Sequence, residues 1–232
     1  MPMRFEWVHE GPEADCAGHC RYWIAATGAV TKWTRQAFDV VIHTHDVRGA
    51  TIVLDSNGGS VGDALTLGRA FRRLGLTTTV GKTIKLPSDG GEERATLSPN
   101  AYCASVCVYL LLGGLHRHVP DEARLFVHQV WPATKRTDAL TANYPAAMLV
   151  GMQRVLGKLA RYTVEMGVDI ELFELSTHVP PWEAMRPLTR DELRRFRVQT
   201  DDSAFGESAP RLNADGALPA APAAQSPAAL KP

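Results

Sequence analysis

The sequence predicts an α/β fold in which helices cover a largely parallel sheet. Short apolar runs rich in β-branched residues alternate along the chain with segments whose apolar residues recur at helical spacing. The run ATIVLDS at 50–56 is continuously apolar between glycine-containing turns, which is typical of a strand buried on both faces. Repeated strand–helix units of this kind indicate helices packed on a mostly parallel sheet.

The first part of the chain contains three predicted strands and two predicted helices. Thr34 is a candidate N-cap for the first helix, and Gly75 is a candidate stop for the second. In chain order, the elements are a strand at 22–30 with a turn at Gly28, a helix at 34–45, a strand at 50–56, a helix at 61–75 and a strand at 76–83.

The later part of the chain follows a polar segment at 84–102, which is rich in chain breakers and is predicted to be an exposed loop. Pro145 is expected in the first turns of a long helix or at a break in it. Thr189 and Glu192 have the spacing of a capping box. The elements are a helix at 105–114, a strand at 123–130, a helix at 139–166 and a short helix at 188–196.

The bulk properties indicate one main domain. We expect an N-terminal extension at 1–20, a folded domain at 21–200 and a disordered Ala/Pro-rich tail at 201–232. The 25 basic and 25 acidic residues cancel, which argues against nucleic acid as the main partner. No apolar run reaches the roughly 18 residues of a membrane span. No signal peptide is visible, so we expect a cytoplasmic protein, or a periplasmic one if the N-terminus is truncated.

The four cysteines form two C-x-x-x-C pairs, Cys16 with Cys20 and Cys103 with Cys107. Three interpretations stay open: small buried thiols, one or more disulfides, or a zinc site helped by His19. A cytosolic location disfavours disulfides, and the spacing is not the usual one of a zinc knuckle. We expect no bound metal. We also expect no cofactor, because the glycine pair at 58–59 belongs to neither a P-loop nor a dinucleotide fingerprint.

Three motifs could carry chemistry. The pair Gly58-Gly59 lies between a strand and a helix, where backbone N–H groups can bind an anion or an oxyanion. Ser105 lies at the start of an apolar helix, where a serine is often a cap but can also be a nucleophile. His128 lies in the apolar strand LFVHQV and could act as the base for a nearby serine.

In this order, the motifs resemble those of the Clp protease proteolytic subunit and of the serine peptidases of the crotonase-like superfold, which include signal peptide peptidase A. IVLDSNGGSVGDALTLGRAFRRLG is similar to the family's strand, Ser-Pro-Gly-Gly turn and helix. CASVCVYLLLGG resembles its Ala-Ala-Ser-Met block, ARLFVHQV its Arg-x-x-x-His-Gln strand and MRPLTRDELRRFRV its terminal segment. The cysteine-flanked serine and CRYWIAATGAV resemble an uncharacterised bacterial group of Clp-protease-like proteins, often predicted periplasmic. The resemblance covers roughly residues 20–200.

The resemblance implies a Clp-protease/crotonase-like fold of repeated ββα units and the activity of a serine hydrolase, most directly a peptidase. Ser105 would attack an acyl carbonyl, and His128 would take its proton and return it to the leaving group. The oxyanion would lie between the backbone N–H groups of Gly59 and Val106, with Gly58 permitting the turn. A peptide or acyl substrate and a homo-oligomer are implied. An ATPase chaperone partner is not implied, because no N-terminal axial loop is visible.

The third member of a triad is the main departure from the family. Met185 falls where the family has its aspartate. Glu183 is the nearest candidate acid, Asp55 or Asp138 could replace it, or the site could be a Ser–His dyad. Loss of the acid lowers the expected activity without abolishing it.

Two other functions therefore stay open. The chain could be a non-catalytic or weakly active member of the same fold that serves as a binding or scaffold module. It could also be a crotonase-type enzyme acting on acyl thioesters, which would use the glycine hole without the serine and the histidine.

Overall fold

The computed structural model describes residues 1–12, 20–87, 93–132, 134 and 138–205. These residues form an α/β fold around a central sheet of seven strands in mixed, mostly parallel pairing. The predicted α/β class is therefore confirmed. Across the sheet the order is β5 (Lys82–Lys85), β6 (Arg94–Ser98), β1 (Arg4–Glu10), β2 (Tyr22–Thr27), β3 (Thr51–Asp55), β4 (Thr77–Val80) and β8 (His116–His118).

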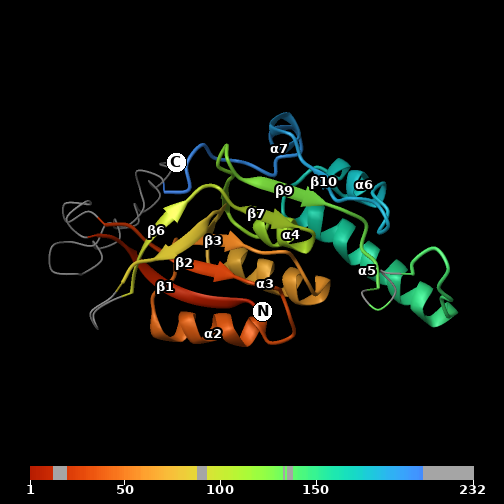
Figure 1. Ribbon diagram of the computed structural model, residues 1–232, viewed down its shortest axis with the longest axis horizontal. Coiled ribbons are helices and arrows are strands. Elements are labelled where there is room, and N and C mark those ends of the chain that lie inside the picture. Colours follow the sequence, from red (N-terminus) through yellow and green to blue (C-terminus); the bar gives the residue numbers. More distant parts are fainter. Residues whose placement is uncertain (13–19, 88–92, 133, 135–137, 206–232) are drawn as a thin grey trace, which may run out of the picture.

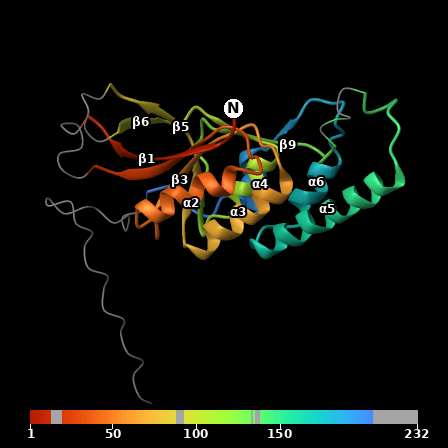
Figure 2. The same cartoon turned by 90° about the horizontal axis from the view of Figure 1, so that it is seen from below.

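Two amphipathic helices cover one face of this sheet, as Figures 1 and 2 show. They are α2 (Thr34–Thr44) and α3 (Val61–Arg73), close to the bounds that the sequence predicted. Phe38 of α2 packs edge-to-face on Phe5 of β1 and on Phe71 of α3, with ring centroids 5.2 and 5.1 Å apart. This aromatic contact joins both helices to the sheet and lies in the main hydrophobic core.

Residues 4–10, expected in an N-terminal extension, are instead strand β1 of the sheet. β1 pairs antiparallel with β2 and parallel with β6. Phe5 packs in the main core, whereas Val8 packs in a second cluster with Trp23 on the opposite face. Because both faces of the strand are covered, its apolar residues do not alternate with polar ones, and the usual pattern of a half-buried strand is missing.

The segment at 84–102 was predicted to be an exposed loop, and this prediction was wrong for its described residues. β5 and β6 form an antiparallel pair at the edge of the sheet, and Ala95 of β6 is fully buried. Lys85 bridges Glu6 of β1 and Glu93, which ties the pair to its neighbour. The strand depends on pairing with β1, more than 80 residues away, which no local pattern reveals.

After Ser105, the described residues form the helices α4 (Val106–Leu111), α5 (Ala146–Glu165), α6 (Glu171–Thr177) and α7 (Arg190–Arg195). α5 begins seven residues later than predicted, because Pro145 occupies its N-cap position rather than its first turns. The predicted capping box of Thr189 and Glu192 is present at the start of α7. α6 was not predicted from the sequence.

The first residues of the expected tail at 201–232 pack on the domain. The N–H groups of Thr200 and Asp201 donate to the carbonyl of Arg117 in β8, and Ala204 is buried. The structure therefore extends the folded part to residue 205. The predicted disorder of residues 206–232 lies outside the described residues.

Candidate active site

The candidate site lies where three neighbouring chain segments end. β7 (Tyr102–Ala104) pairs parallel with β9 (Arg124–Val127), which in turn pairs antiparallel with β10 (Arg186–Pro187). On its other side, Cys103 of β7 forms a parallel bridge with Ser56, directly after β3. The glycine pair, the serine and the histidine each follow one of the segments β3, β7 and β9. Because the carboxyl ends of parallel strands meet at one edge, the three motifs come together there.

Ser105 forms a strained turn between β7 and helix α4. Its φ of 59° and ψ of −129° place a non-glycine residue at positive φ, which costs on the order of 1–3 kcal/mol. The N–H of Ser105 donates to the carbonyl of Phe126 in β9 at 2.8 Å, and its carbonyl accepts from the N–H of Val108 at 3.1 Å. Turns of this strand-to-helix kind are known from hydrolases, where they expose a nucleophilic serine.

The side chains of Ser105 and His128 are in direct contact. The distance between Ser105 Oγ and His128 Nε2 is 2.7 Å, within the range of a nucleophile–base hydrogen bond. For the hydroxyl to donate to Nε2, the ring must carry its proton on Nδ1, which is buried. Both residues are half-buried, so a substrate can approach while bulk water is partly excluded.

The glycine turn packs directly against the serine. Gly58 has a φ of 92°, and a Cβ placed on it would lie 2.7 Å from the carbonyl oxygen of Ala104 and 2.8 Å from Ser105 Cβ. Ser56 orders this turn, because its Oγ donates to the Gly28 carbonyl at 2.6 Å and accepts from the N–H of Gly58 at 3.1 Å. Only a residue without a side chain allows the two segments to approach this closely.

Two backbone N–H groups are available beside Ser105. Val30 donates to the carbonyl of Gly58 and accepts from the N–H of Ser60, so the N–H of Gly59 is not the group that pairs with Val30. Among the described residues, neither Gly59 N–H nor Val106 N–H donates a hydrogen bond. The Val106 nitrogen lies 3.1 Å from the Cβ position of Gly58. An oxyanion hole needs donors of this kind beside the nucleophile, so the two N–H groups are its candidates.

The structure does not bring a candidate acid from the sequence analysis to His128. Glu183 is exposed, and its hydrogen bond is a backbone one, to the Pro180 carbonyl. Asp138 is exposed too, and burial raises the pKa of Asp55 while the charge of Lys82 lowers it. None of these three carboxylates bonds to His128.

Met185 lies at the position across from His128. β10 pairs Arg186 with Val127 in antiparallel register, and one further residue in each direction places Met185 opposite the histidine. The side chain of Met185 is half-buried. A thioether accepts hydrogen bonds only weakly, so this residue cannot orient the imidazole as a carboxylate would.

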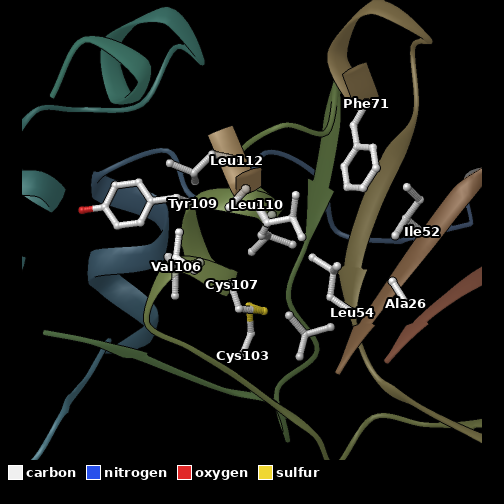
Figure 3. Packing of buried hydrophobic residues seen from close by; sticks show 14 of the residues in the cluster. Ala26, Ile52, Leu54, Phe71, Cys103, Val106, Cys107, Tyr109, Leu110 and Leu112 are labelled. Atoms are coloured by element: carbon white, nitrogen blue, oxygen red, sulfur yellow. A yellow bond between two sulfur atoms is a disulfide. The ribbon is translucent and has the colours of Figure 1, made fainter. Parts of the chain in front are cut away.

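The cysteines on either side of the serine are bonded to each other. Cys103 and Cys107 form a disulfide whose Cα atoms are 5.3 Å apart, and both side chains are fully buried. Figure 3 shows this bond among apolar side chains, including Val106 and Leu54. Of the three interpretations of the cysteines, the structure supports a disulfide for this pair. Within the described part of the chain, no group of three or more His, Cys, Asp or Glu residues could hold a metal ion. Cys16 and His19 lie outside it.

Sequence reasoning missed two features of the site. Ser56, which orders the glycine turn, has no signal beyond its place in the DSNGG motif. Trp131, three residues after His128, forms an aromatic cluster with Tyr144 and Trp182, with centroid distances of 5.5 and 6.3 Å. Trp182 is half exposed, so the cluster presents apolar surface a few residues from the base. Its members are too far apart in the sequence to form a local motif.

Comparison with known proteins identifies no relative of this chain. No protein-family model matches the chain, and no curated protein sequence matches it. No helix within the described ranges is both long enough and apolar enough to cross a membrane. The fold and the geometry of the site therefore stand as the basis for a function.

Proposed function

We propose that the chain is a serine hydrolase, most directly a peptidase, of the Clp-protease/crotonase-like kind. The observation that carries the proposal is the 2.7 Å contact between Ser105 Oγ and His128 Nε2. Ser105 lies at a strained turn, close to the candidate N–H donors of Gly59 and Val106. The order of the motifs supports the family, as does the α/β fold with its mostly parallel sheet. Neither a metal nor a cofactor enters the proposal.

The proposed reaction proceeds through an acyl-enzyme. Ser105 Oγ attacks the substrate carbonyl while His128 Nε2 takes the hydroxyl proton. The oxyanion that forms accepts hydrogen bonds from the N–H groups of Gly59 and Val106. His128 then donates the proton to the departing amine or alcohol, and a water molecule repeats the sequence to release the acid and restore Ser105.

The aromatic cluster indicates the kind of substrate. Trp131 follows His128 by three residues and packs edge-to-face on Trp182, which is half exposed. Peptides or acyl groups with apolar side chains would bury this surface on binding. We also propose a homo-oligomer without an ATPase chaperone. The disulfide favours an oxidising compartment over the cytoplasm, because such bonds persist where thiols are not kept reduced.

Met185 favours a second candidate, a weakly active or non-catalytic member of the same fold. The residue opposite His128 cannot stabilise an imidazolium, so a binding role would not require the acid. The two proposals differ in whether Ser105 reacts. An acyl-thioester enzyme of the crotonase type differs from both, because its turnover would survive the loss of Ser105.

The decisive experiment is labelling by a fluorophosphonate probe, which reacts with activated serines. We expect the wild type to be labelled, and Ser105→Ala and His128→Ala to lose labelling by at least about 100-fold, because nucleophile and base act as a unit. Matched controls are Ser98→Ala in β6 and His118→Gln in β8, which remove the same residue types away from the site.

Two results would contradict the hydrolase. One is a folded wild type that does not react with the probe, which would favour the binding module. The other is thioester turnover that is equal in wild type and Ser105→Ala, which would favour the crotonase-type reaction. Since Cys103 and Cys107 form a disulfide, a thiol-specific probe is expected to leave both unlabelled in the oxidised protein.

A further inference from the structure

The disulfide encloses the strained serine. Cys103 is the middle residue of β7 and Cys107 is the second residue of α4, so the ring closed by their bond contains only Ala104, Ser105 and Val106 between them. Both sulfur-bearing side chains are fully buried and belong to the main core. The bond thus spans the turn that contains Ser105, and Figure 3 shows it among the buried apolar side chains next to Val106.

Each end of this ring is fixed by other contacts. Cys103 is paired on both sides, with Leu125 of β9 and with Ser56 beside the glycine turn. Cys107 lies in a helix whose residues from Val106 to Leu111 are all buried. The disulfide therefore joins two rigid segments across the one joint between them, and that joint is Ser105 with its φ of 59°.

We propose that the Cys103–Cys107 disulfide is a positioning device for Ser105, and that its reduction by a dithiol switches the hydrolase off. The inference rests on the proposed function, since it concerns the same nucleophile. A non-glycine residue at positive φ persists only when its surroundings impose that conformation. When the bond is absent, α4 can shift relative to β7, the turn can relax, and the contact between Ser105 Oγ and His128 Nε2 is lost.

The location of the bond argues for a local role rather than for general stability. The stabilisation that a disulfide gives by restricting the unfolded chain grows with the length of the closed loop. The loop here has a sequence separation of four residues, which is among the least effective choices for that purpose. Strand pairing and core packing already hold both segments in place. What the bond adds is a restraint on the turn between them.

The proposed switch is an ordinary thiol–disulfide exchange. A thiolate of the dithiol attacks one sulfur of the pair, which breaks the bond between the cysteines and forms a mixed disulfide. The second thiol of the reductant then closes its own disulfide and releases the other cysteine. The pair gains two electrons and two protons, and the dithiol is oxidised to a cyclic disulfide. Because the sulfurs are buried, exchange proceeds through local opening at the turn.

The test compares oxidised and dithiothreitol-reduced protein under native conditions. The variant Cys16→Ser/Cys20→Ser removes the other cysteine pair and leaves one reducible bond, whose state is read by a mass increase of 2 Da for two added hydrogens. We expect reduction to lower the maximal rate of fluorophosphonate labelling by at least about tenfold, with little change in the probe's binding constant. Circular dichroism should show that the reduced protein is folded, and reoxidation should restore the rate.

The double variant Cys103→Ala/Cys107→Ala is the matched control. We expect it to be labelled as slowly as the reduced protein and to be insensitive to dithiothreitol. A reduced protein that is labelled within about twofold of the oxidised one would overturn the inference and leave the hydrolase intact. If neither form is labelled, the proposed function fails, and hydrogen exchange decides the positioning role by itself.

The exchange experiment follows the amide of Val108, which donates to the carbonyl of Ser105 at 3.1 Å. If the disulfide positions the turn, reduction should speed exchange of this amide by at least about tenfold, while amides in β2 and β3 keep their protection. Equal exchange of the Val108 amide in the two states would overturn the positioning role, whatever the outcome of labelling.

Discussion

Ser105 illustrates how the backbone of one residue determines what its side chain can do. At the start of a helix, a serine in extended conformation usually caps the first N–H groups with its hydroxyl. Ser105 has a positive φ instead, makes no side-chain cap, and directs its Oγ to His128. Its conformation is therefore unfavourable for a cap and suited to a nucleophile. The order of the motifs indicated this choice, but the sequence around Ser105 alone favoured the cap.

Met185 gives the sharpest test at the scale of one residue. It lies opposite His128, so Met185→Asp would place a carboxylate where it can hold the imidazole and stabilise its charged form. We expect the rate of fluorophosphonate labelling to rise by about tenfold or more, because orienting acids contribute up to about 10⁴-fold in complete triads. The measurement is the pseudo-first-order labelling rate at pH 7.

Met185→Leu is the control for this substitution, because it changes the side chain without adding an acceptor. It should be labelled at the wild-type rate. If Met185→Asp reacts no faster than Met185→Leu, the residue opposite the histidine does not limit the reaction. The carboxylate would then have to act from another element.

The residues of the site that directly follow a strand could be predicted from the sequence. Those whose position depends on contacts between distant segments could not. The glycine pair, Ser105 and His128 could be predicted because each follows a strand, and the strands are adjacent in the structure. The exposure of Glu183 could not be predicted, because this residue is close to the expected position of the acid in sequence but its side chain is exposed. The disulfide between Cys103 and Cys107 could not be predicted either, because it depends on the turn that brings their Cα atoms to 5.3 Å from each other.

At the scale of elements, the capping box of α7 ties the last helix to the candidate site. Glu192 accepts the N–H of Thr189 and bonds with Arg186 of β10, the strand that pairs beside His128. The hydrogen bond from Arg186 lowers the pKa of Glu192 below its usual 4.5. The carboxylate therefore contributes stability above pH 4.5, and this contribution is lost as the pH falls through the lower pKa of the folded state.

We expect Glu192→Gln to lower the free energy of unfolding by about 1 kcal/mol at pH 7. The loss should shrink as the pH falls below 4, because the wild-type carboxyl then becomes neutral as well. Urea unfolding at pH 7 and pH 3 measures the difference. Glu174→Gln, at an exposed position of α6, is the control substitution. An equal deficit at both pH values would show that the charge of Glu192 does not stabilise β10 and α7.

The elements that the sequence predicted well are those whose pattern is local. α3 has one apolar face and a glycine after it, and both its ends fall within two residues of the prediction. β1 and β6 were missed because each is a strand only through its neighbours: β1 is covered on both faces, and β6 pairs with it across more than 80 residues. The start of α5 was misplaced because Pro145 can begin a helix as well as interrupt one.

At the scale of the whole molecule, Arg117 closes the fold. It is nearly fully buried in β8 and donates to the carbonyls of Val198 and Arg197, while its own carbonyl accepts from Thr200 and Asp201. Burial lowers the pKa of Arg117 to about 10, so it stays charged at neutral pH. A guanidinium has several N–H donors in a fixed plane, so it can bind more than one backbone carbonyl of the segment at 197–198. Residues 197–201 are thereby bound to the edge of the sheet, on the far side of β4 from the glycine turn.

Helix α5 leaves apolar side chains uncovered. Figure 2 shows its first half extending beyond the rest of the molecule, and none of residues 146–158 is buried. Leu149 and Val150 expose 50% and 44% of their surface. Since about half of each residue is already covered, burying the rest against a second copy of the chain would contribute about 1 kcal/mol each. This surface is where we expect the proposed homo-oligomer to form.

The double variant Leu149→Glu/Val150→Glu tests this expectation, because two charges at a buried interface would oppose association. Light scattering after size exclusion should show the wild type as an oligomer and the variant as a monomer with unchanged circular dichroism. Val40→Glu, on an exposed position of α2, should stay oligomeric. A wild type that is monomeric at tens of micromolar, or a variant with the wild-type mass, would contradict assembly through α5. Since Ser105 and His128 come from one chain, the monomeric variant should keep its fluorophosphonate labelling, which separates assembly from the chemistry of the site.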